Sequence, residues 1–242
     1  MNMTPTKGAR FISSFSKQYK KMKQGDHVIV CPSFLTLPKI ASILKKNKKI
    51  HLGSQDVFWE DKGNFTGEVS PAVLKKLGVE YTIIGHSERR KIMKETDEMV
   101  NKKLHLLVES GITPILCIGE NLIERKKGMT HAVLSRQLRK GLMGLKKGRR
   151  LLIAYEPIWA ISKGGKGEVC TVDIIKTELH YIKTTLTKLG IQKRFSKISL
   201  LYGGSVTPNS IKGIMNIPEV DGVLVGNASL GTSTFNNIVS VC

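Results

Sequence analysis

Short apolar runs alternate with longer amphipathic stretches along the whole chain. Continuous apolar runs of this kind fit strands that are buried on both faces, and the amphipathic stretches fit helices between them. The predicted strands cover 28–31, 50–54, 82–84, 113–117, 151–155, 198–202 and 222–225. The predicted helices cover 5–23, 37–47, 96–110, 121–145 and 172–189. This alternation predicts an α/β fold with a parallel sheet.

Helix starts are marked by three similar dipeptides, Thr4-Pro5, Ser70-Pro71 and Thr207-Pro208. Each offers a side-chain cap followed by a proline at the first helical position. No linker and no break in composition divides the chain, so we expect one domain over residues 1–242.

One predicted strand ends in a carboxylate. The apolar run 151–155 leads to Glu156, and a segment rich in lysine and glycine follows at 162–167. Parallel α/β folds place their ligands at the carboxyl ends of strands, so Glu156 is the first candidate catalytic group. A glutamate at a strand end more commonly caps a turn or pairs with a lysine, and Glu156 therefore needs support from other strand ends.

Other strand ends supply that support. His86 follows the third predicted strand, and glycine-rich segments follow the last two, at Gly203-Gly204-Ser205 and at Gly226-Asn227. Glycine lets backbone N–H groups approach a phosphate that also faces a helix N-terminus. A single histidine is more often structural, and either glycine loop alone could be an ordinary turn. Their combination with Glu156 favours an anion-binding active site.

Taken together, these segments closely resemble the triosephosphate isomerase family. The resemblance implies a TIM (β/α)8-type barrel and an isomerase that interconverts glyceraldehyde 3-phosphate and dihydroxyacetone phosphate through an enediol, in glycolysis and gluconeogenesis. The matching segments follow the family's order from Met1 to the C-terminus and lie at 55–70, 84–90, 154–160, 202–205, 224–226 and 228–230.

The resemblance also implies roles for individual residues. Glu156 would be the base and His86 a neutral electrophile; this reaction is itself a standard example of that pairing. Ser87 and Glu88 would support them, with a surface salt bridge from Glu88 to Arg89 as the alternative for that carboxylate. The remaining assignments are an apolar clamp that desolvates the base, formed by Ile161 and Leu230, and phosphate-binding N–H groups of Ser162, Ser205, Gly226 and Asn227. No metal and no organic cofactor is implied.

The resemblance predicts that the first β-strand of such a barrel has no counterpart in this sequence. The sequence opens directly into the predicted helix after Thr4, whereas family members begin with a strand that ends in Asn-x-Lys-Met-Asn. Met1-Asn2 aligns with the last two letters, so the family's substrate-binding Asn and Lys have no counterpart. Three explanations stay open: a start assigned at an internal Met, a natural truncation with two unpaired strand edges, or another chain or lysine that fills the vacancy.

The loop 63–68 resembles the family segment that inserts into a neighbouring subunit. The resemblance thus implies a homodimer in which Thr66 reaches toward the partner. Because the family's Asn and Lys are missing, Thr66 would face a pocket of the partner that lacks these two side chains.

Composition bears on the compartment of the protein and on whether it holds a metal or disulfides. The chain has 242 residues, 40% of them hydrophobic, with neither a secretory signal nor an apolar stretch that could span a bilayer, so we expect a cytoplasmic protein. Its four cysteines lack the spacing of a zinc site or a disulfide framework.

The net charge of +20 could indicate a protein that binds nucleic acid, but aromatic residues are only 6% of the chain and the lysines occur as scattered pairs. A solvated basic surface that attracts a phosphorylated substrate is the preferred interpretation.

Two other functions compete with the isomerase. One is a catalytically impaired barrel that binds phosphorylated ligands or polyanions, favoured by the missing lysine and the positive charge. Glu156, His86 and the phosphate loops argue against it, because a scaffold needs no such combination. The other is another phosphosugar isomerase or an aldolase on the same barrel. The absence of a Schiff-base lysine at a strand end argues against the aldolase, and the matching segments argue against the rest.

Overall fold

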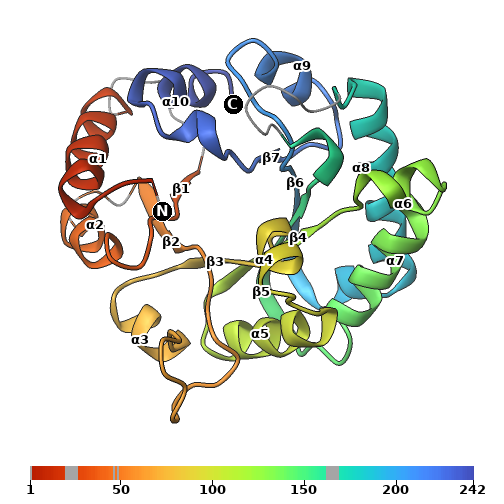
Figure 1. Ribbon diagram of the computed structural model, residues 1–242, viewed down its shortest axis with the longest axis horizontal. Coiled ribbons are helices and arrows are strands. Elements are labelled where there is room, and N and C mark those ends of the chain that lie inside the picture. The colour runs from red at the N-terminus through yellow and green to blue at the C-terminus, as the bar shows by residue number, and fades with distance from the viewer. Residues whose placement is uncertain (1, 20–26, 46, 48, 162–168) are drawn as a thin grey trace.

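The protein, described here as a computed structural model, is a curled parallel sheet surrounded by helices (Figure 1). The structure describes residues 2–19, 27–45, 47, 49–161 and 169–242. Its seven strands lie side by side in chain order, and every neighbouring pair is parallel. The strands are β1 (Val28–Val30), β2 (Ile50–Ser54), β3 (Tyr81–Ile84), β4 (Thr113–Ile118), β5 (Gly148–Tyr155), β6 (Phe195–Tyr202) and β7 (Gly222–Val223). All seven strand predictions are confirmed, and all but β2 differ from the prediction at one or both ends.

Helices follow the strands in turn and cover the outside of the sheet, as Figure 1 shows. The α-helices are α1 (Pro5–Tyr19), α2 (Leu37–Leu44), α3 (Pro71–Lys76), α4 (Ser87–Ile92), α5 (Asp97–Glu109), α6 (Leu122–Lys126), α7 (Thr130–Gly141), α8 (Val172–Lys188), α9 (Ile211–Met215) and α10 (Thr232–Val239). The 3-10 helices are η1 (Ile158–Ala160), η2 (Ile191–Lys193) and η3 (Asn227–Ser229). Within the described part of the chain, no helix is long and apolar enough to cross a membrane.

Two helix predictions are wrong in detail. The expected helix 121–145 is broken into α6 and α7, because Gly128 adopts a φ of 66°, which the helix cannot accommodate. Thr207-Pro208 begins a turn in which the Ser210 N–H donates to the Thr207 hydroxyl at 3.2 Å, and α9 starts only at Ile211. Ser70-Pro71 does begin a helix, since the Ser70 hydroxyl accepts from two N–H groups of α3.

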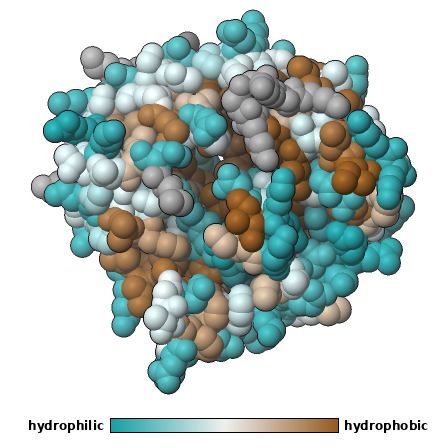
Figure 2. All heavy atoms as spheres, viewed as in Figure 1, coloured by the Kyte–Doolittle hydropathy of each residue, from teal (hydrophilic) through white to brown (hydrophobic). Residues whose placement is uncertain are grey.

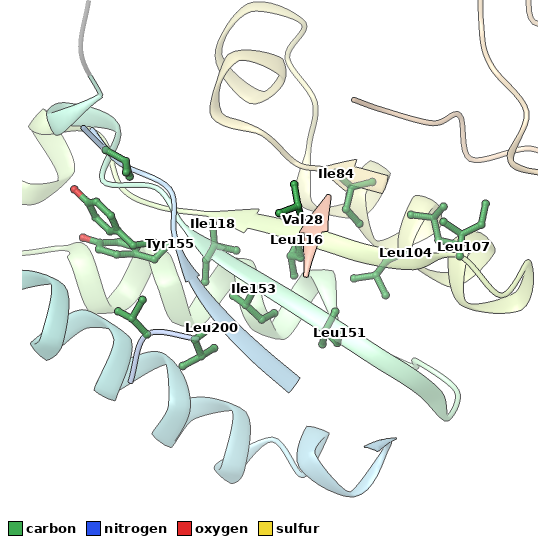
Figure 3. Close-up of a cluster of buried hydrophobic side chains, with 14 of the residues drawn as sticks. Val28, Ile84, Leu104, Leu107, Leu116, Ile118, Leu151, Ile153, Tyr155 and Leu200 are labelled. Carbon is green, nitrogen blue, oxygen red and sulfur yellow. The ribbon is translucent and has the colours of Figure 1, made fainter. Parts of the chain in front are cut away.

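The apolar side chains form two layers, one inside the curled sheet and one between the sheet and the helices. Along β4, Ile115 and Cys117 face the inner layer, whereas Leu116 and Ile118 face the outer one. The close-up of the outer layer shows β4 and β5 packing against the helices (Figure 3). Both faces of these strands are buried, which explains their continuous apolar runs. The interpretation of Cys117 as a packing residue is confirmed.

A buried ion cluster, formed by Lys103, Asp56, Glu95 and Arg89, ties α4 and α5 to the segment after β2. The Lys103 side chain is only 1% exposed and pairs with Asp56 at 2.6 Å and with Glu95. The guanidinium of Arg89 pairs with Asp56 at 2.9 Å and with Glu95 at 3.3 Å. Burial raises the pKa of Asp56 and the Lys103 charge opposes that rise. The helix that carries His86 at its start is thereby anchored through Arg89 in its first turn.

Candidate active site

Glu156 lies immediately after β5, held between the ends of β4 and β6. Its N–H donates to the Ile118 carbonyl at 2.7 Å. A side chain at Gly119 would overlap the carbonyl of Glu156, and a Cβ at Gly203 would lie 3.0 Å from its Cγ. Two glycines at strand ends therefore let the backbone approach closely enough to fix this carboxylate in place.

The carboxylate of Glu156 directly contacts two residues that follow β3. Its Oε1 lies 3.0 Å from Nε2 of His86, and its Oε2 accepts from the Ser87 N–H at 2.9 Å. The Glu156 side chain is 2% exposed. The alternative in which Glu156 pairs with a lysine is wrong, because the partners of its carboxylate are an imidazole and a backbone N–H.

His86 caps the N-terminus of α4, a short helix that follows the turn at Gly85, whose φ is 65°. The Glu88 N–H donates to Nδ1 of His86 at 3.3 Å. This hydrogen bond assigns the acceptor role to Nδ1 and leaves the proton of a neutral imidazole on Nε2, the atom that faces Glu156. The helix N-terminus also disfavours a positive charge at this position.

The pKa of His86 reflects opposing influences. Burial lowers it most, but the hydrogen bond and the negative charge of Glu156 together outweigh burial, so the pKa lies above its ordinary value. The imidazolium is thus stabilised only while Glu156 is ionised and in contact. A ligand that separates the two side chains removes that support and returns His86 to the neutral form.

This balance predicts the effect of removing the carboxylate charge. In the variant Glu156→Gln, the pKa of His86 is expected to fall from above its ordinary value of about 6.5 to below it, since only the weaker influence of the Glu88 charge then opposes burial and the helix N-terminus. The measurement is a pH titration of the His86 ring resonances by NMR in both proteins. An unchanged or higher pKa in the variant would contradict the assignment of Glu156 as the stabilising partner.

Ser87 and Glu88, the first two residues of α4, differ in burial. Ser87 is buried and supplies its N–H to Glu156. Glu88 has a side chain that is 79% exposed, with Oε2 3.9 Å from His86 Nδ1. Arg89 points instead to Asp56 and Glu95, so the structure does not place it in a surface pair with Glu88.

A second buried carboxylate was missed by the sequence analysis. Glu120 is fully buried and accepts from Trp159 Nε1 at 2.7 Å and from the Tyr155 hydroxyl at 3.2 Å. Arg125 pairs with it at 3.2 Å and lies over the Trp159 ring, 4.3 Å from its centroid. Glu120 therefore fixes η1, the element between Glu156 and Ile161. Its place just after β4 is the signal that could have found it, the same signal that identified Glu156.

The expected phosphate loops follow the paired strands β6 and β7 and so lie next to each other. Ser205 is half-buried, and Gly226 and Asn227 are exposed, with Asn227 beginning η3. Ile161 is half-buried and Leu230 is 40% exposed. Figure 2 shows this face of the molecule hollowed near its centre, with apolar and hydrophilic atoms side by side. Ser162 lies outside the described residues.

The cysteines offer no nucleophile or ligand cluster at the site. Cys117 is buried beside Glu156, and burial, followed by the charge of that carboxylate, raises the pKa of the thiol well above its usual range. Among the described residues, no group of three or more His, Cys, Asp or Glu side chains is placed to hold a metal ion.

Comparison with known proteins places these features in a family. Residues 1–242 match the sequence profile of triosephosphate isomerase. The triosephosphate isomerase of Clostridium tetani is 45% identical over 223 residues, which cover 91% of this chain and 86% of that protein. That of Thermoanaerobacter pseudethanolicus is 40% identical over 242 residues, 99% of this chain and 95% of that protein. The crystal structure of triosephosphate isomerase from Bartonella henselae superposes with a TM-score of 0.86 and 31% identity, covering 100% of this chain and 94% of that one.

Proposed function

The chain belongs to the triosephosphate isomerase family, and we propose that Glu156 and His86 carry out that family's reaction at the carboxyl ends of the strands. The chain's activity is that of an isomerase with the TIM-barrel fold, which interconverts D-glyceraldehyde 3-phosphate and dihydroxyacetone phosphate in glycolysis and gluconeogenesis. The observation that carries the assignment of residues is the 3.0 Å contact between Oε1 of Glu156, whose side chain is 2% exposed, and Nε2 of His86.

The two side chains take complementary roles in proton transfer. Glu156 removes the proton from C2 of glyceraldehyde 3-phosphate, while the Nε2–H of His86 donates to the oxygen on C1, which gives the enediol. Glu156 then returns its proton to C1, and His86 recovers a proton from the hydroxyl on C2 as that oxygen becomes the ketone. In the unliganded protein the two groups touch, so the substrate must enter between them. Its entry breaks the contact that stabilises the imidazolium and leaves a neutral donor.

Backbone N–H groups bind the substrate, and apolar side chains keep water away from the base. The N–H groups of Ser162, Ser205, Gly226 and Asn227 would hold the phosphate, with no metal or organic cofactor. Ile161 and Leu230 would cover the base, because a carboxylate is stronger as a base when it is shielded from water. Buried Glu120 supports this arrangement, since it holds Trp159 of η1, two residues before Ile161.

A coupled assay tests the activity itself. The purified chain of 242 residues should convert glyceraldehyde 3-phosphate to dihydroxyacetone phosphate, read out through a dehydrogenase that consumes the product. Addition of a chelator should leave the rate unchanged. A rate that does not exceed the uncatalysed one would refute the assignment of activity to this chain alone.

We infer that residues 1–242 form one domain and that the protein is a cytoplasmic homodimer. The outer apolar layer extends from Ile12 in α1 to Val239 in α10, which supports a single core. None of the four cysteines, all within the described residues, forms a disulfide, which fits a reducing compartment. The loop between β2 and α3 projects from the barrel in Figure 1, and Thr66 on it is exposed. A projecting loop of this kind fits insertion into a partner subunit.

The loop gives a prediction for assembly. Thr66→Arg places a charge at the tip of the segment that would enter the partner, and is expected to shift the protein from dimer to monomer in sedimentation velocity. Lys62→Ala, at an exposed position of the same loop but before the segment 63–68, is the control and should leave the dimer intact. A wild-type protein that sediments as a monomer would contradict the proposal.

A further inference from the structure

Glu120 shares the guanidinium of Arg125 with a second buried carboxylate. Nη1 of Arg125 lies 3.2 Å from Oε1 of Glu120 and 3.8 Å from Oε1 of Glu178. Glu178 is on α8, and its side chain is only 9% exposed. One guanidinium nitrogen therefore lies between two buried negative charges, and each attracts it. The position of Arg125 thus depends on what else neutralises Glu178.

His131 of α7 supplies the second positive charge beside Glu178. Its Nε2 lies 3.2 Å from Oε2 of Glu178, and its own side chain is 52% exposed. Tyr181 of α8 holds the imidazole in place, because the two rings are stacked with centroids 3.8 Å apart and the Tyr181 hydroxyl donates to the His131 carbonyl at 3.2 Å. α7 contacts both α6 and α8, and Figure 1 shows the three helices together on one side of the barrel.

Arg125 also bears on η1, the short helix that follows the base. Its guanidinium lies over the ring of Trp159, whose Nε1 donates to the Glu120 carboxylate at 2.7 Å. The N–H of Ile158 donates to the main-chain carbonyl of Glu120 at 3.1 Å. A movement of Arg125 toward α8 would take a positive charge away from Glu120 and from the Trp159 ring at once. Ile161 follows η1 directly, so its position depends on the same contacts.

Glu120, Glu178, Arg125 and His131 form a charge cluster with two negative and two positive charges when the imidazole is protonated. Burial raises the pKa of Glu178, and the charge of His131 is the strongest influence that opposes this rise. Glu120 adds to the rise and Arg125 opposes it. Without a charge on His131, Arg125 is the cation on which both carboxylates depend.

Histidine is the side chain that ordinarily changes charge near neutral pH. The other titratable groups at the charge cluster do not. Tyr155 donates to Glu120, and Cys170 lies within the influence of both carboxylates. Burial raises the pKa of both side chains, that of the thiol to about 12, and it raises the pKa of Tyr202 beside Cys170 as well. A change in the cluster near neutral pH therefore points to His131.

We propose that His131 and Glu178 are positioning residues for the catalytic site. The protonated imidazole neutralises Glu178, so that Arg125 stays on Glu120 and η1 keeps its place. A neutral imidazole leaves Glu178 free to draw Arg125 away. The inference rests on the proposed function in one respect, which is that Ile161 after η1 covers the base. Neither positioning residue touches the reacting atoms, and both act through Arg125.

The indole N–H of Trp159 reports the state of η1 without any need for isomerase activity. The chain has two tryptophans, so heteronuclear NMR spectra should contain two indole signals, and Trp59→Phe identifies that of Trp159. Its chemical shift should follow the protonation of the His131 ring between about pH 5.5 and 8.5. His131→Gln should abolish this dependence and hold the signal at its high-pH position. The control is His180→Gln, which removes an exposed histidine 3.8 Å from Glu219 and should leave the dependence unchanged.

A double variant separates positioning from a general loss of packing. Glu178→Gln removes the carboxylate that competes for Arg125, so His131→Gln combined with Glu178→Gln should return the Trp159 signal to its low-pH position. Damage to packing would instead accumulate over the two substitutions. His131→Arg carries a permanent positive charge and should hold the signal at the low-pH position throughout.

Turnover supplies a second readout. At about pH 6, His131→Gln should lower kcat about two- to fivefold, the effect of one partly exposed ion pair. KM should change little, because the shielding of the base is affected and the binding of phosphate is not. The deficit should disappear at about pH 8.5, where the wild-type imidazole is neutral too, and in the double variant.

Three results would overturn the proposal: a Trp159 signal that does not follow His131, a double variant more perturbed than His131→Gln, or a kcat deficit of equal size at both pH values. A chain without isomerase activity whose Trp159 signal follows His131 would refute the proposed function and leave the coupling between His131 and η1 established.

Discussion

Replacing Glu156 by Gln is expected to lower kcat by a factor of about 10² to 10⁴, the usual contribution of a positioned general base. The amide keeps the size of the side chain and its carbonyl oxygen can still accept from the Ser87 N–H, which is 2.9 Å from Oε2 in the wild-type protein. What it loses is the ability to take a proton. The loss should therefore appear in turnover, with the folded structure preserved.

The control for this variant is Glu98→Gln, which also removes one negative charge but lies on the surface of α5. The Glu98 side chain is 60% exposed and pairs with Lys140 at 2.8 Å, so kcat should change little. The rates are measured in both directions with coupled assays, and circular dichroism confirms folding. If Glu156→Gln retained turnover within a few-fold of wild type, or Glu98→Gln lost as much, the base would have to be another group.

The second large effect concerns stability. Lys103→Met is expected to reduce the free energy of unfolding by about 3–5 kcal/mol, the usual cost of breaking a buried ion pair from one side. Methionine fills a similar volume, but it leaves Asp56 and Glu95 buried with Arg89 as their remaining cation. Lys102→Met, at the exposed neighbouring position, should change stability by only about 0.5 kcal/mol.

The deficit in Lys103→Met should depend on pH. The pKa of Asp56 is already raised by burial in the wild type, and loss of Lys103 raises it further. An acid whose pKa is higher in the folded state than in the unfolded state binds more protons when folded, so stability falls as pH rises through that interval. The gap between variant and wild type is therefore largest near neutral pH and narrows in mild acid. Urea unfolding at several pH values measures this, and a gap that widens in acid would contradict the account.

The seven strands were predictable because each is buried on both faces. The run 151–155 contains no charged residue that would interrupt its apolar pattern. β5 begins three residues earlier than this run, at Gly148, and the two arginines in this extension were not recognisable as part of the strand. Helix ends were harder to predict, because they depend on local backbone geometry. Gly128 ends α6 through its positive φ, and nothing in the residue alone distinguishes it from a glycine tolerated within a helix.

The proximity of Glu156 and His86 was predictable from topology, and the ion cluster was not. Glu156 and His86 both follow strands of one parallel sheet, and the carboxyl ends of such strands meet on one face. Lys103 lies within α5, where a lysine normally faces solvent, and its partners Asp56 and Glu95 come from other segments. Its burial depends on how α5 packs against the segment after β2, which the spacing of residues along the chain does not encode.

Isomerisation of glyceraldehyde 3-phosphate in deuterium oxide, followed by proton NMR, tests the central claim most directly. The purified wild-type chain should produce dihydroxyacetone phosphate with deuterium on C1, since a carboxylate that holds the transferred proton exchanges it with solvent. At equal enzyme concentration, Glu156→Gln should form both product and deuterium label about 10² to 10⁴ times more slowly. Absence of product with the wild-type chain, or equal product and label with both proteins, would contradict the claim that Glu156 is the base of this isomerase.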